Sequence, residues 1–202
     1  MKLHYEKTFN GDVTTLPQRE HAPGSVKFRE PDDPSRMALI ANGGALVLMV
    51  LTFGGLFLRI LHAQDIVLTD FPAQFLIGAL LFLVTVFPHE LLHASCFRGD
   101  VYLYTYLKKG MLFVVGPEDM SRGRFVFMSL LPNLVFGFLP YLLFMLQPAW
   151  LWLGVLGATA IPGGFGDYFN VFNCLTQVPK GGIVYLSGMN SYWYLPSSSE
   201  MR

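Results

Sequence analysis

The sequence predicts an all-α membrane protein with four transmembrane helices and a short cytoplasmic β-hairpin between the second and the third helix. Of its 202 residues, 52% are hydrophobic and only 14% are charged. This hydrophobic fraction exceeds that of an ordinary soluble domain. Four apolar stretches are long enough to cross the ~30 Å hydrocarbon core as helices. The hairpin is expected because a shorter stretch is rich in Val, Tyr, Thr and Phe.

Each predicted span has its own charge pattern. The first is uncharged until Arg59, the third carries no charge, and the fourth contains one acid, Asp167. The second is uncharged except for the run His-Glu-Leu-Leu-His. The spans are expected at 37–61, 72–97, 125–146 and 150–175, with the hairpin at 101–115.

The distribution of Lys and Arg predicts the orientation in the membrane, since positively charged loops tend to stay in the cytoplasm. With both termini inside, only Arg59 lies near the outer face. We therefore expect a multi-pass protein of a bacterial cell membrane with cytoplasmic termini. Its four-helix membrane domain would cover 37–176, between a loosely ordered arm at 1–36, which is rich in charge and proline, and an interfacial tail at 177–202.

Charge and cysteine content exclude two classes of protein. Lys plus Arg and Asp plus Glu both total 14, so the chain lacks the basic excess of proteins that bind nucleic acid. Two cysteines, Cys96 and Cys174, are too few for a disulfide framework. We expect two inert buried thiols; a redox-sensitive pair or a spare metal ligand is the alternative.

The HELLH run is the candidate metal-binding and catalytic motif. In a helix, positions i and i+4 point the same way, so His89 and His93 can present two imidazole nitrogens to one Zn²⁺ ion while Glu90 stands beside them. Glu90 would be the general base that activates water. The alternative is a helix end whose polar groups merely reach the membrane interface. Three ionisable residues within five positions of a span favour the metal site, because burying them without a metal, a partner or a cavity is costly.

Asp167 is the candidate third ligand. It follows Trp150, at the start of its span, by 17 residues, just as His89 follows Pro72, so the two groups lie level on parallel helices. A protonated, isolated acid is the alternative. The glycines at 163, 164 and 166, just before Asp167, allow close helix approach or let the helix unwind to aim the carboxylate; small-residue helix packing alone is the alternative.

Two asparagines are further candidates. Asn170, one turn beyond Asp167, could hydrogen-bond a metal ligand, and Asn133 could bind substrate backbone. A membrane Asn also commonly bonds a neighbouring helix, and the adjacent Pro132 favours a structural kink.

The HELLH span, the later helix with an isolated Asp after glycines, and the intervening hairpin together resemble the site-2 protease superfamily of intramembrane metallopeptidases. They resemble more closely a family of small multi-pass zincin peptidases. The resemblance implies that His89, His93 and Asp167 bind zinc, that Glu90 is the catalytic base, and that the hairpin lines the substrate path. The segment GFGDYFN departs from the superfamily's Leu-Asp-Gly pattern, because Tyr168 follows Asp167.

We therefore predict a membrane-embedded zinc metalloendopeptidase that hydrolyses a membrane protein or peptide in or near the lipid bilayer. A second hypothesis keeps the same chemistry but acts on soluble or membrane-surface peptides. A third is a catalytically silent metal-binding scaffold or sensor. The sequence does not predict the oligomeric state.

Overall fold

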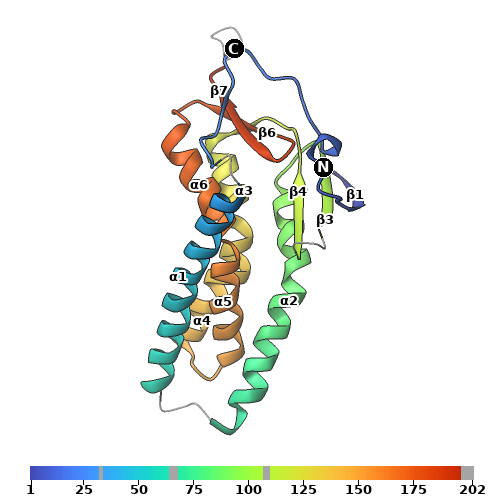
Figure 1. The fold of residues 1–202 in the computed structure, drawn as a ribbon. Helices are drawn as coiled ribbons and strands as arrows, with labels where there is room; N and C mark the ends of the chain where they lie inside the picture. Colours follow the sequence, from blue (N-terminus) through green and yellow to red (C-terminus); the bar gives the residue numbers. More distant parts are fainter. Residues whose placement is uncertain (32–33, 64–67, 107–109, 197–202) are drawn as a thin grey trace. The chain divides into compact units, whose positions relative to one another are not determined.

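The computed structural model describes residues 1–31, 34–63, 68–106 and 110–196, and the chain forms two compact units. Unit 1 comprises residues 1–30, 90–130 and 169–202, and unit 2 comprises residues 31–89 and 131–168. The boundary falls inside three helices, between residues 89 and 90, 130 and 131, and 168 and 169, and Figure 1 labels elements of both units.

The helices follow the apolar stretches, and three of them are long and apolar enough to cross a membrane. The third is one continuous helix over residues 122–146, in which a π-helical segment η4 separates two α-helical parts. The helical elements are α1 (Pro34–Leu61), α2 (Phe71–Ser95), α3 (Arg122–Asn133), η4 (Leu134–Phe138), α4 (Leu139–Leu146), α5 (Leu151–Gly163) and α6 (Phe165–Gln177).

The predicted fourth span is wrong. Residues 150–175 do not form one long helix, because the chain breaks at Gly164 into α5 and α6. At 13 residues each, these helices are about 20 Å long, short of the ~30 Å core. Pro162 and the glycines at 163 and 164 explain the break, since proline removes a helical donor and glycine weakens a helix.

The all-α class is also wrong, because unit 1 contains two β-sheets. The expected hairpin is present as β3 (Asp100–Tyr106) and β4 (Met111–Val115), although residues 107–109 lie outside the described chain. Strand β1 (Lys2–Thr8) adds to β3 in parallel, in the order β1-β3-β4.

The second sheet joins both ends of the sequence. Its order is β2-β7-β6-β5, and all its pairings are antiparallel. The loosely ordered arm expected at 1–36 is wrong for residues 1–31, because this stretch supplies strands to both sheets and buries Phe9, Leu16 and Phe28. The strands are β2 (Val26–Lys27), β5 (Met120–Ser121), β6 (Ile183–Ser187) and β7 (Asn190–Tyr194).

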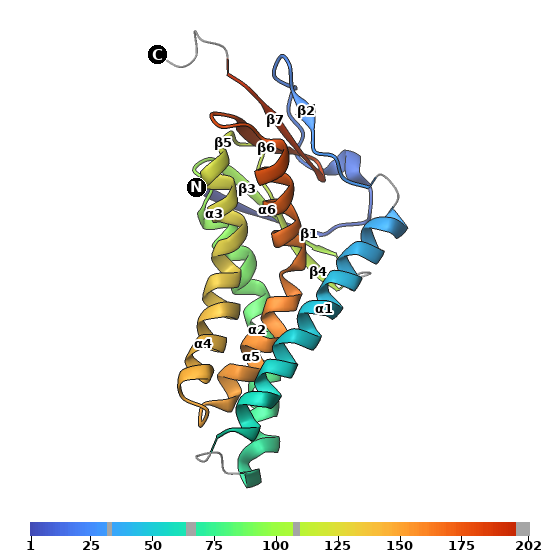
Figure 2. The ribbon, with the colours of Figure 1, turned by 90° about the vertical axis from the view of Figure 1, so that its left-hand side faces the viewer.

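Unit 2 is held together by close helix contacts. Helix α5 lies against α1 and α4, and Figure 2 shows α1 alongside α5. Thr52 of α1 donates a hydrogen bond to the Ala158 carbonyl of α5 at 2.9 Å. A Cβ added at Gly157 would lie 2.7 Å from the Gly137 carbonyl oxygen, so a small residue is needed where these helices meet.

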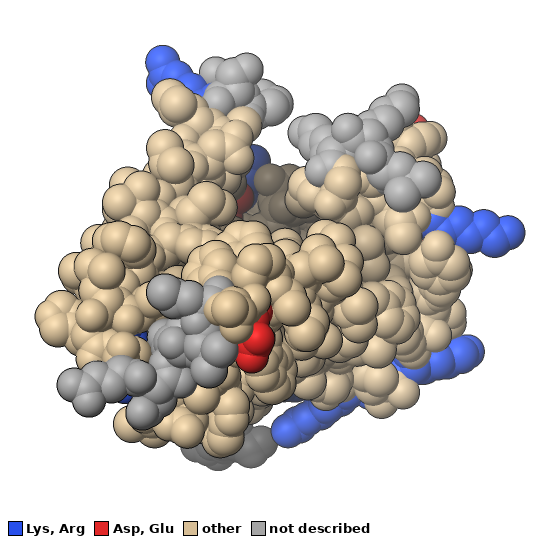
Figure 3. Space-filling view, turned by 90° about the horizontal axis from the view of Figure 1, so that it is seen from below, with Lys and Arg blue, Asp and Glu red and all other residues tan. Residues whose placement is uncertain are grey.

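Apolar side chains cover much of the helical surface. Leu46, Val50 and Leu58 of α1 and Leu83 and Val84 of α2 are each more than half exposed. The view in Figure 3 shows few charged side chains among many uncharged ones. Such a surface suits lipid, in agreement with the three candidate spans.

We expect Gly157→Ala to destabilise the protein by about 1–3 kcal/mol, because the added methyl group meets helix backbone that cannot yield locally. Gly54→Ala on α1 is the matched control, since a Cβ there has nothing within 4 Å. It should be neutral or stabilise by up to ~1 kcal/mol through helix propensity. Reversible unfolding in detergent micelles measures both; equal stabilities would contradict the packing argument.

Candidate metal centre

The HELLH run occupies the last two turns of α2. His89, Glu90 and His93 offer ligand atoms that all lie within 4.8 Å of one another. The helix ends just beyond them: the Cys96 and Phe97 amides close its last turn by donating to the His93 and Ala94 carbonyls, as tightened helix ends do. One continuous helix therefore presents all three side chains.

Asp167 lies beside the first histidine. Its Oδ2 atom is 3.3 Å from Nε2 of His89, and both side chains are largely buried, at 17% and 23% exposure. Tetrahedral zinc with bonds of about 2.0–2.2 Å places neighbouring ligand atoms about 3.4 Å apart. This distance therefore fits two ligands of one ion, and two imidazoles with a carboxylate are a donor set that zinc accepts.

Asn133 holds the carboxylate. Its amide nitrogen donates to Asp167 Oδ2 at 2.7 Å, and its own oxygen accepts from the Tyr168 hydroxyl at 3.3 Å. Asn133 is only 1% exposed. A Cβ at Gly164 would lie 1.6 Å from Asn133 Oδ1, so this glycine makes room for the amide that orients Asp167. Of the readings left open for the glycines, close approach applies at Gly164.

His93 is oriented from its other ring nitrogen. Its Nδ1 lies 2.8 Å from the Met128 carbonyl oxygen of α3, and the side chain is 6% exposed. A backbone carbonyl at Nδ1 fixes the tautomer that leaves Nε2 for a metal. Pro132 explains why this carbonyl can accept: it stands four residues after Met128 and has no N–H to donate to it.

The remaining candidate, Asn170, does not share the contacts that the other candidate residues make. Asn170 lies on α6 one turn after Asp167 and makes no side-chain hydrogen bond with the described part of the chain. The Tyr168 hydroxyl as a partner of Asn133, and the Met128 carbonyl as a partner of His93, were missed by sequence reasoning. For Met128 a signal existed, because a proline four positions later in a predicted helix leaves its carbonyl without a helical partner.

Comparison with known proteins gives one result. A family model described as "Putative zincin peptidase" matches residues 82–183, just over half of the chain. The chain belongs to this family. Searches of curated proteins and of solved structures gave no match. Membership of a zincin peptidase family indicates that the protein is a zinc metallopeptidase, in agreement with the His-Glu-His group on α2.

The two cysteines of this zincin peptidase are free thiols in one hydrophobic cluster of unit 1. Burial raises the pKa of Cys96, and burial also raises the pKa of Cys174 to about 11. Since the thiolate is the nucleophile and the metal ligand, these raised pKa values favour the expected pair of inert thiols over a redox-sensitive pair or a spare metal ligand.

Alkylation tests this assignment. At pH 8 both thiols should react with iodoacetamide much more slowly than free cysteine, because a raised pKa lowers the thiolate fraction. The rate at Cys174 should keep rising until the pH approaches about 11. Unfolded protein is the control, and a fast-reacting thiol in the folded protein would contradict the assignment.

Asn133→Ala should weaken zinc binding about tenfold, because removing an outer partner of a metal ligand typically costs 10- to 100-fold in affinity. Asn170→Ala is the matched control and should bind zinc like the parent. Competition with a chromophoric chelator measures both affinities. Equal affinities for the two variants would show that Asn133 does not support the metal site.

Proposed function

We propose that this zincin peptidase is a membrane-embedded zinc metalloendopeptidase of the site-2-protease type, hydrolysing peptide bonds in or near the membrane. The observation that carries the proposal is the 3.3 Å approach of Asp167 Oδ2 to His89 Nε2, next to the HExxH motif. Three apolar helices long enough to cross a membrane support the location.

In the proposed mechanism, His89, His93 and Asp167 would hold the ion, which when bound would supply Lewis acidity toward the scissile carbonyl and the attacking water. Glu90 accepts the proton of the water whose oxygen bonds to the carbonyl carbon, and passes that proton to the leaving nitrogen as the C–N bond breaks. Asn133 fixes the Asp167 carboxylate, and the Met128 carbonyl fixes the His93 ring. No second acid is needed.

The sheet order supports a route for the substrate. Strand β3 is paired on both sides, by β1 and β4, so within the described chain β1 and β4 are the two edge strands of this sheet, and β4 belongs to the hairpin. An extended substrate can add to such an edge through main-chain hydrogen bonds. We place the substrate segment along Met111–Val115, where pairing would keep its backbone extended and accessible to hydrolysis.

Charge supports a cytoplasmic position for unit 1. Of the 14 Lys and Arg residues, all but Arg36 and Arg59, and hence 12, fall within its sequence ranges. Positive charge is retained on the cytoplasmic side during insertion. We therefore propose that substrates are cleaved from the cytoplasmic side.

Glu90→Gln tests the function. It should leave zinc stoichiometry unchanged and lower turnover by about 10²- to 10⁴-fold, because only the proton acceptor is removed. His89→Ala is the control and should lose zinc. Membrane proteomes of cells carrying each form would show uncleaved substrate accumulating with Glu90→Gln.

The outcomes separate the three hypotheses. A parent protein without zinc would refute the enzyme. Cellular function that survives Glu90→Gln with zinc bound would support the silent scaffold or sensor instead. Accumulation confined to soluble peptides would refute cleavage in the membrane while leaving the zinc chemistry intact.

A further inference from the structure

An arginine ties the end of α2 to the start of α3 within unit 1. The Arg124 guanidinium donates from Nε to the Cys96 carbonyl oxygen at 2.9 Å, and its Nη2 donates to the same atom. Cys96 follows His93 by three residues, where α2 gives way to the turn before β3. Arg124 therefore takes up a carbonyl that the helix itself no longer pairs.

Glu118 completes this contact from the segment before α3. Its Oε1 atom lies 2.6 Å from Arg124 Nη1, and its Oε2 accepts the backbone N–H groups of Arg98 and Gly99 at 2.6 and 2.8 Å. Partial burial acts to raise the pKa of Glu118, but these donors and the Arg124 charge together hold it below the ordinary value. The carboxylate is thus ionised at neutral pH and holds both the turn and the guanidinium.

The same two helices meet again one turn further on. Met128 stands four residues after Arg124 on α3, and its carbonyl receives the His93 ring. Arg124 and Met128 share a helix face, and their partners Cys96 and His93 lie within one turn at the end of α2. The Arg124 contact and the Met128 contact therefore join the same two helices within one turn of each other.

We propose that Arg124 is a positioning residue of the metal centre. With Glu118 it fixes the register of α2 on α3, and so keeps the Met128 carbonyl at His93 Nδ1 with Nε2 presented to zinc. This inference rests on the proposed zinc site. Arg124 and Glu118 contact no zinc-ligating atom, yet their contacts determine how tightly His93 binds zinc.

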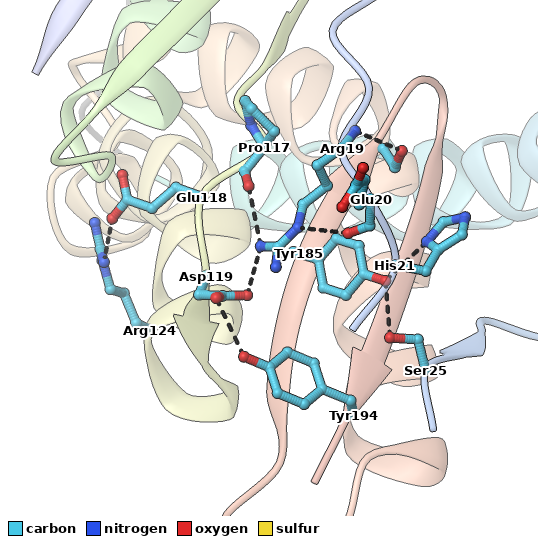
Figure 4. Close-up of polar contacts among 11 residues, drawn as sticks. Arg19, Glu20, His21, Ser25, Pro117, Glu118, Asp119, Arg124, Tyr185 and Tyr194 are labelled. Atoms are coloured by element: carbon cyan, nitrogen blue, oxygen red, sulfur yellow. Dashed lines mark hydrogen bonds and ion pairs between the residues drawn. The ribbon is translucent and has the colours of Figure 1, made fainter. Parts of the chain in front are cut away.

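Arg19 provides a matched control on the neighbouring residues. Its Nη1 donates to Asp119 Oδ1 at 2.7 Å and to the Pro117 carbonyl at 3.3 Å, and the guanidinium lies 4.2 Å from the centre of the Tyr185 ring. Figure 4 shows Arg19 and Arg124 bound to adjacent residues of one segment, Asp119 and Glu118. Arg19 joins this segment to β6, whereas Arg124 joins it to the end of α2.

The test compares zinc affinity, measured by chelator competition, with the thermal stability of the zinc-free protein. Arg124→Ala should weaken zinc binding about tenfold, in the range for lost outer partners. Arg19→Ala should stay within about twofold of the parent, even if its zinc-free form melts at a lower temperature. Arg124→Lys should lie between Arg124→Ala and the parent, because an ammonium group cannot reproduce the guanidinium's forked contacts.

A double variant tests whether the two residues act together. Glu118→Gln keeps a side-chain oxygen that can accept the Arg98 and Gly99 N–H groups and removes the ion pair with Arg124. Arg124→Ala with Glu118→Gln should therefore bind zinc no more than about twofold more weakly than Arg124→Ala alone. If the losses of zinc affinity in the two single variants multiply in the double variant, Glu118 and Arg124 do not act together and the proposed arrangement is wrong.

The proposal would be overturned if Arg124→Ala bound zinc as tightly as the parent, or if Arg19→Ala weakened zinc binding as much as Arg124→Ala does. If Arg124→Ala fails to fold, parent affinity in Arg124→Lys overturns it equally. A parent that binds no zinc refutes the proposed function instead, so the two failures are distinguishable.

Discussion

The cost of placing ionisable and hydrogen-bonding groups in apolar helices governs this structure. A charged side chain in a membrane span costs several kcal/mol or more unless it is paired, and an unpaired buried polar group is also expensive. Helix α2 carries two histidines and a glutamate near its end, and α6 carries Asp167. The structure meets this cost with specific partners: Asp167 approaches His89, Asn133 holds Asp167, and Met128 holds His93.

Two prolines leave backbone carbonyls free to accept hydrogen bonds from side chains of other helices. Pro132 leaves the Met128 carbonyl to His93, and Pro162 stands four residues after Ala158, whose carbonyl accepts from Thr52. A proline in a helix is usually considered a source of kinks. Here each proline also releases one acceptor, which a side chain from another helix then uses. The positions of Pro132 and Pro162 therefore determine which helices are linked by hydrogen bonds.

Sequence reasoning succeeded where the signal was local. Three apolar runs predicted three long helices. Asp167 does lie 3.3 Å from His89, but the equal spacing that paired the two residues assumed one unbroken helix over 150–175, which the structure contradicts. Their role as zinc ligands stays a prediction. The fourth span failed because counting apolar residues ignores a break at Gly164. The strands of residues 2–8 and 26–27 were missed because their partners, β3 and β7, lie far along the chain and leave no periodic pattern in a polar segment.

Unit 1 is built from three separate stretches of chain, and its first strands pair with residues made much later. Strand β1 needs residues 100–105, and β2 needs Tyr192 and Trp193. During synthesis at about 5–20 residues per second, these pairings must wait for the intervening helices to emerge. Non-local pairing is slow to form for the same reason. Because β7 ends at Tyr194, the four-stranded sheet can be completed only when nearly the whole chain has been made, after all of its apolar helices.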